Sequence, residues 1–153
     1  METYLELKKR HEKEFSAFPM IFAFSDKQFK EGMGKLGLTV NDTDKIYKNS
    51  FGWYYKKTDR ETLKNLMHRH SDEFKAAIEN DQDGTGFILG MFDYELANHE
   101  YCITYDITDT IDALGLTVGD INKSKSLLNG LQLAKKVSLS STINTYREKG
   151  LES

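Results

Sequence analysis

The two residues whose types and spacing come closest to a catalytic pair are His99 and Cys102, the only cysteine in the chain. If both lie on one helix, a spacing of three residues makes them neighbours, and an imidazole beside a thiol can activate it as a nucleophile. A free cysteine is more often a packed apolar side chain, however, and no glycine-rich elbow or oxyanion feature lies beside this one. We therefore favour a structural role for Cys102 and predict no catalytic residues.

Metal chemistry would need histidines that converge. On a helix, His68 and His70 lie about 200° apart, so they cannot chelate one ion together. His70 would have to meet His99, Glu95 or His11 from another element, which spacing alone does not show. The sequence accordingly favours no metal and no cofactor. A small metal- or thiol-dependent enzyme that uses His70, His99 and Cys102 remains an alternative.

Tyrosines alternate with carboxylates between residues 94 and 112. Aromatic side chains anchor protein interfaces, and carboxylates complement a basic surface, so this region predicts binding of a protein partner that has a basic surface. The alternative is an ordinary core edge, in which tyrosine hydroxyls satisfy buried polar groups. The candidate partner-binding residues are Tyr94, Glu95, His99, Glu100, Tyr101, Tyr105, Asp106, Asp109 and Asp112.

A second aromatic cluster comprises Trp53, Tyr54 and Tyr55, followed directly by Lys56 and Lys57. Such a mixture can stack bases and hold phosphate, which makes a nucleic-acid-binding module the other alternative. The same residues equally suit a strand edge that lysines protect. The net charge of −3, with 24 acidic against 21 basic residues, argues against a general nucleic-acid surface.

The secondary-structure elements that position these residues are predicted to form an α+β fold that is predominantly α-helical. Apolar spacing predicts five to six helices around one core, including one from 87 to about 102. Local signals mark helix ends: Thr3 and Glu6 form a capping box, and Gly37 and Gly115 stop helices within related Leu-Gly-Leu-Thr-Val segments. The segments 18–24 and 44–57 predict a small two- or three-stranded β element.

The 153 residues are most simply a single domain, 1–153, with a frayed tail at 140–153. One cysteine cannot form an internal disulfide, which fits a reducing compartment. The chain begins with charged residues, without the apolar core of a signal peptide, and no apolar run approaches the ~18 residues that span a bilayer. We expect a cytoplasmic protein without membrane contact.

Four segments resemble a family of small bacterial proteins of unknown function, often carried by phages and other mobile elements. They are 18–24 (FPMIFAF), 36–38 (LGL), 96–104 (LANHEYCIT) and 109–116 (DTIDALGL). The resemblance covers roughly residues 1–130 and implies no activity or catalytic residue. What it implies is an accessory protein of a mobile element or its host, and proteins of this size often act by binding and blocking. The resulting hypothesis is a non-catalytic protein-binding accessory protein, one version being an anti-defence (anti-CRISPR-like) inhibitor of a nuclease.

Overall fold

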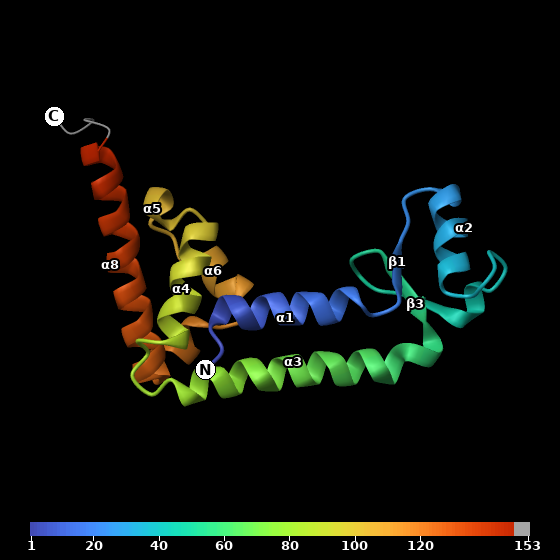
Figure 1. Ribbon diagram of the computed structural model, residues 1–153, viewed down its shortest axis with the longest axis horizontal. Helices are drawn as coiled ribbons and strands as arrows, with labels where there is room; N and C mark the ends of the chain where they lie inside the picture. Colours follow the sequence, from blue (N-terminus) through green and yellow to red (C-terminus); the bar gives the residue numbers. More distant parts are fainter. Residues whose placement is uncertain (149–153) are drawn as a thin grey trace. The chain divides into compact units, whose positions relative to one another are not determined.

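The computed structural model describes the backbone of residues 1–148 and the side chains of residues 1–140 (Figure 1). The α-helices are α1 (Tyr4–Ser16), α2 (Asp26–Lys35), α3 (Arg60–Asn80), α4 (Phe87–Asn98), α5 (Tyr101–Thr104), α6 (Thr108–Ala113), α7 (Val118–Lys123) and α8 (Lys125–Glu148). The strands are β1 (Met20–Phe22), β2 (Ile46–Lys48) and β3 (Trp53–Lys56), and two 3₁₀ turns, η1 (Thr43–Lys45) and η2 (Lys57–Asp59), precede β2 and α3. The predicted α+β, predominantly helical fold class is confirmed.

Eight α-helices occur in this part of the chain, against the five to six expected. The difference comes from α5, α6 and α7, which are four to six residues long and too short to show a 3.6-residue repeat. The predicted frayed tail, 140–153, overlaps the end of α8, and its residues 149–153 lie outside the described residues.

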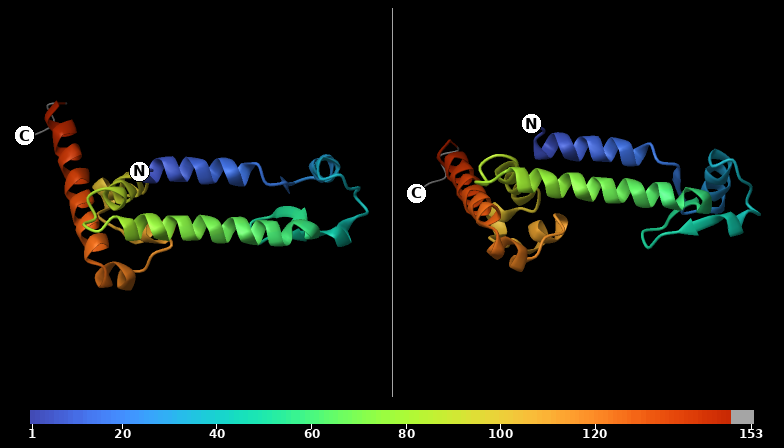
Figure 2. Two further views of the ribbon diagram at one scale, coloured as in Figure 1. Left: turned by 60° about the horizontal axis from the view of Figure 1, so that its bottom comes forward. Right: turned by 90° about the horizontal axis from the view of Figure 1, so that it is seen from below.

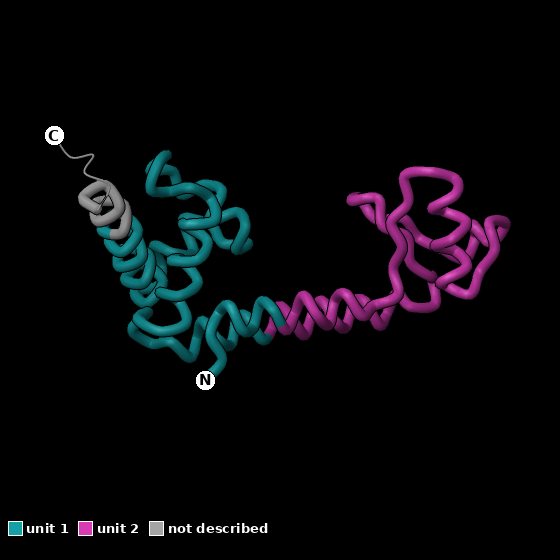
Figure 3. The backbone as a smooth tube through the Cα atoms, turned by 45° about the horizontal axis from the view of Figure 1, so that its top comes forward, with its two compact units in different colours: residues 1–9, 73–153 teal, residues 10–72 magenta. Residues whose placement is uncertain are grey.

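The chain divides into two compact units (Figure 3). Unit 1 comprises Met1–Lys9 and Glu73–Ser153, and unit 2 comprises Arg10–Asp72. The buried apolar side chains form two clusters, one in each unit, where the sequence predicted one core. The expectation of a single domain over 1–153 remains a prediction.

Unit 1 is built on the packing of α4 against α8 (Figures 1 and 2). The apolar residues of α4 fill its interior, and Ile88, Met91, Phe92 and Leu96 have no exposed area. Gly130 in α8 allows the close approach: a Cβ at this position would lie 2.5 Å from Ile88 Cγ2 and 2.7 Å from the carbonyl oxygen of Gly84. Any larger residue at position 130 would have to push these neighbours apart.

The loop before α4 is organised by one buried carboxylate. Asp81 accepts hydrogen bonds from the backbone N–H groups of Gly84, Gly86 and Ile88 at 2.9–3.1 Å. These N–H groups have no partner within the helix, so the carboxylate caps the helix start and holds the loop.

Two helices end in the manner that the repeated Leu-Gly-Leu segments predict. Gly37 and Gly115 adopt left-handed backbone conformations with φ of +73° and +66°. The next N–H, of Leu38, donates to the carbonyl of Met33 at 2.8 Å, and the N–H of Leu116 makes the corresponding bond at 3.1 Å. Both ends are therefore Schellman motifs, and the sequence echo has a local cause.

Unit 2 contains a three-stranded antiparallel sheet in the order β1-β3-β2. Tyr54 lies opposite both Ile21 and Lys48, which fixes the register. Because side chains alternate along a strand, one face of the sheet packs on α2, and the other carries Phe22, Trp53 and aromatic neighbours. The predicted β element at 18–24 and 44–57 is confirmed, with three strands.

No helix in the described part of the chain combines the length and the apolar content that crossing a bilayer requires.

Candidate binding sites

The predicted partner-binding residues divide by burial. Glu95 and Tyr101 are buried and are not available to a partner, which corrects their assignment to the surface. His99 is partly exposed, and Tyr94 is exposed along one side while its ring packs on Tyr4. The remaining candidates are exposed: Glu100, Tyr105, Asp106, Asp109 and Asp112.

Glu95 has partners inside unit 1. The hydroxyl of Tyr4 donates to Glu95 Oε1 at 2.6 Å, and Lys8 Nζ lies 4.0 Å from the same oxygen. His99 Nε2 lies 3.4 Å from Oε2, an ion-pair distance without the angles of a hydrogen bond. A buried carboxylate without such partners would be costly, so this arrangement gives Glu95 a structural role.

The predicted helix from 87 to about 102 is wrong at its end. α4 stops at Asn98, and Glu100 follows in a left-handed conformation with φ of +57° before α5 begins. His99 and Cys102 are therefore not three residues apart on one helix, and the spacing argument for a thiol–imidazole pair fails. The reason is that the chain leaves α4 after Asn98 and forms a short loop before α5, which the spacing of apolar residues does not reveal.

His70 has its neighbours within unit 2, and one of the three residues named as possible metal partners, His11, contacts it. Its Nε2 lies 2.7 Å from Glu14 Oε2, and its ring stacks on His11 with centroids 3.8 Å apart. Hydrogen bonds from Arg69 and then His70 lower the pKa of Glu14 to about 2. Among the described residues, no three His, Cys, Asp or Glu side chains are grouped so as to hold a metal ion. The proposed use of His70, His99 and Cys102 together gains no support from this geometry.

The exposed tyrosine–carboxylate region centres on α5. Glu100 and Tyr105 bracket this single turn, and they are the two non-glycine residues with positive φ in the part that the structure describes. Such conformations are unfavourable for bulky residues and concentrate at functional sites. They leave Ile103 71% and Tyr105 66% exposed, while the Tyr105 ring contacts the buried ring of Tyr101.

Exposed carboxylates flank these two side chains along the chain, at Glu100 before them and at Asp106, Asp109 and Asp112 after them. Asp106 is held in place because it accepts hydrogen bonds from the backbone N–H and the hydroxyl of Thr108, and these bonds lower its pKa. Asp109 and Asp112 follow on α6 and are exposed. We call Glu100, Ile103, Tyr105, Asp106, Asp109 and Asp112 the α5 surface. Sequence reasoning missed Ile103, whose only signal is a single aliphatic residue between Cys102 and Thr104.

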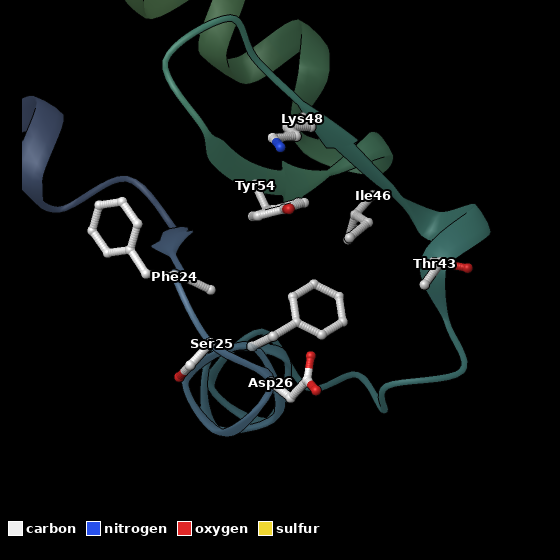
Figure 4. A pocket seen from close by; sticks show the side chains of 9 residues that line it. Phe24, Ser25, Asp26, Thr43, Ile46, Lys48 and Tyr54 are labelled. Atoms are coloured by element: carbon white, nitrogen blue, oxygen red, sulfur yellow. The ribbon is translucent and has the colours of Figure 1, made fainter.

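The residues of the other candidate, 53–57, form β3 and the start of η2. Trp53 and Lys57 are exposed, whereas Tyr54, Tyr55 and Lys56 are partly buried. The structure adds two aromatic residues that the sequence did not connect with them, Phe22 and Phe24. A pocket of about 520 Å³ opens beside the same strand (Figure 4).

Fold and surfaces together define a small, predominantly helical α+β protein with a three-stranded sheet and two separate candidate binding sites. A family model, DUF7659, described as a family of unknown function, matches residues 3–137, and the chain belongs to this family. Comparison with curated proteins and with solved structures gives no match.

Proposed function

We propose that this protein is a non-catalytic binding protein and that its α5 surface holds a protein partner with a basic surface. The observation that carries the proposal is the exposure of Ile103 and Tyr105 between two left-handed residues. An apolar side chain and an aromatic one that are held out in this way match the anchors that dominate protein interfaces. The contact between the rings of Tyr101 and Tyr105 holds this turn in place, so both anchors stay exposed to a partner.

Charge supports a basic partner. Unit 1 carries 15 Asp and Glu residues against 9 Lys and Arg, a formal charge of −6, whereas the whole chain has −3. Four of these carboxylates belong to the α5 surface. Charges at the rim of an interface steer association and select the partner, while the anchors supply most of the affinity.

The nucleic-acid groove of a nuclease is one basic surface of the required kind. Together with the resemblance to proteins carried by mobile elements, it supports the more specific form of our proposal, an accessory protein that blocks a defence nuclease in the bacterial cytoplasm. In this form the carboxylates of the α5 surface take the place of phosphates in the groove.

The test begins with capture of partners from host lysate on tagged protein, followed by affinity measurements with the purified partner. Ile103→Asp and Tyr105→Asn remove the anchors; asparagine accepts the left-handed backbone at position 105. Each should weaken binding about 30-fold, the size of a hot-spot residue. Val118→Asp, a similar change at another exposed apolar residue of unit 1, is the matched control and should bind like wild type.

Charge reversal separates the rim from the anchors. Asp109→Lys with Asp112→Lys should slow association and reduce its dependence on salt, whereas Asp93→Lys, on the exposed side of α4, should not. Full affinity of Ile103→Asp and Tyr105→Asn for every captured partner would refute the proposal.

A further inference from the structure

Three aromatic side chains from two segments of the chain meet at the sheet of unit 2. The ring of Phe22 lies 5.1 Å from that of Trp53 and 4.4 Å from that of Phe24, centroid to centroid. Phe24 is 81% exposed, and Phe22 and Trp53 remain 40% and 37% exposed. Clustered aromatic residues left open to water mark binding surfaces more often than single ones do.

Phe24 follows the edge strand β1 and also lines the 520 Å³ pocket, which lies on the α2 side of the sheet, opposite the face that carries Phe22 and Trp53. A chain that passes over this edge can contact the rings on one face and the pocket on the other. The pocket has the size that takes one small molecule or one nucleobase. Tyr54, Phe29 and Ile46 supply its apolar wall. The amine of Lys48 lies 5.6 Å from the centre of the Tyr54 ring. Figure 4 shows this amine on one side of Tyr54 and Asp26 at the other end of the pocket.

Besides Lys48 and the Tyr54 hydroxyl, the pocket is lined by three polar side chains, those of Ser25, Asp26 and Thr43. Carboxylate and hydroxyl oxygens accept hydrogen bonds from the N–H groups of bases, the N3–H of thymine included, and Lys48 donates to anions. Among the described residues, the Lys48 amine has no carboxylate within ion-pair distance. It is therefore a cation that a bound phosphate can reach.

The charge of unit 2 is opposite to that of unit 1. Residues 10–72 carry 12 Lys and Arg against 9 Asp and Glu, a formal charge of +3 that the net charge of the whole chain hides. Cations accompany the aromatic rings: Lys57 and Arg60 lie 5.1 and 5.7 Å from the centre of the Tyr47 ring. Rings interleaved with cations fit a ligand that presents both flat faces and negative charge.

We propose that unit 2 binds single-stranded nucleic acid, with bases stacked on Phe24 and Trp53 and one base entering the pocket beside Lys48. An apolar peptide segment would use the rings and leave the cations unused, whereas a single strand engages both. A duplex keeps its bases stacked on one another, so their faces are not available to these rings. The proposal concerns unit 2 alone and does not depend on the α5 surface.

The fluorescence of Trp53 reports on this site specifically, because it is the only tryptophan in the chain. Titration of the full chain with a thymidine oligomer of about 12 nucleotides, within the range of known single-strand sites, should quench its fluorescence to saturation. The logarithm of the binding constant should fall linearly with that of the salt concentration, with a slope of about −0.7 for each phosphate contact.

Two variants and two matched controls assign the contacts. Phe24→Ala should weaken oligomer binding about tenfold or more, the usual effect of losing one stacked base, and its high exposure leaves folding intact. Lys48→Gln should weaken binding and reduce the salt slope by about 0.7. Tyr105→Asn on the α5 surface and Lys64→Gln on α3 remove an exposed aromatic and an exposed cation elsewhere, and both should bind like wild type.

Four results would overturn the proposal: no quenching, binding without quenching of Trp53, a duplex that binds as tightly as the single strand, or wild-type affinity in Phe24→Ala. A titration with thymidine monophosphate completes the experiment. Much weaker binding of the mononucleotide than of the oligomer is the expected result, and equal affinity would mean that the pocket takes a free nucleotide instead of a strand.

Discussion

Replacing Tyr4 with phenylalanine removes a single hydroxyl from the interior of unit 1. That hydroxyl donates to Glu95 Oε1 at 2.6 Å, and both side chains are more than nine-tenths buried. The ring of Tyr4 keeps its contacts with Phe74, Phe87 and Tyr94, so the change is confined to the hydrogen bond. It therefore tests whether Glu95 is structural, as its burial indicates, or a partner-binding residue, as its sequence position suggested.

The expected loss follows from the type of bond. A hydrogen bond to a charged group contributes about 1.5–3 kcal/mol, and leaving a buried carboxylate short of a donor adds to the cost of its burial. Lys8 and His99 remain near the carboxylate and compensate in part. We expect Tyr4→Phe to lower the free energy of unfolding by about 2 kcal/mol.

Urea denaturation measures this directly, as a lower midpoint with an unchanged dependence on denaturant. Tyr105→Phe is the matched control: the same atom is removed from a residue that is 66% exposed, and the loss should stay below about 0.5 kcal/mol. A double-mutant cycle with Glu95→Gln should show a coupling of about 1 kcal/mol or more. A loss in Tyr4→Phe no larger than in the control, or strictly additive effects in the cycle, would refute the reasoning.

Two further predictions concern packing and pH. Gly130→Ala should destabilise the protein by about 1–3 kcal/mol in the same denaturation assay, because the new Cβ would lie 2.5 Å from Ile88. Gly90→Ala, in α4 with no atom within 4 Å of the new Cβ, should instead stabilise by about 0.5–1 kcal/mol, and a stabilising Gly130→Ala would contradict the packing. For Glu14, a folded-state pKa of about 2 against an ordinary value of 4.5 means that its stabilising effect is complete above pH 4.5 and is lost as the pH falls toward 2. The difference in stability between wild type and Glu14→Gln should follow that course, and a difference that stays constant from pH 6 to pH 2 would contradict it.

Sequence alone anticipated the features that depend on residues a few positions apart. The capping box of α1 is present in both directions: Glu6 N–H donates to Thr3 Oγ1, and Thr3 N–H donates to Glu6 Oε2. The glycine stops at Gly37 and Gly115 are of the same local kind. The segments 18–24 and 44–57 also predicted the small sheet, although not the order in which its three strands pair.

The candidate sites were predicted less well, because exposure and convergence depend on distant parts of the chain. Tyr101 and Glu95 belong to the right region but face the interior, and Ile103, which faces solvent, gave only a weak signal. The aromatic cluster of unit 2 joins Phe22 and Trp53, 31 positions apart, through strand pairing that periodicity does not specify.

Composition and spacing by themselves therefore determined the helical character, the ends of several helices and the presence of a small sheet, since these depend on backbone hydrogen bonds and side-chain periodicity within one or two turns. Only the tertiary structure decided that Glu95 meets Tyr4 from 91 positions away and that the chain divides into one unit with a formal charge of −6 and another with +3. The physical reason is that the burial and the electrostatic environment of a residue depend on its neighbours in space. The packing of whole helices and strands determines which residues those neighbours are.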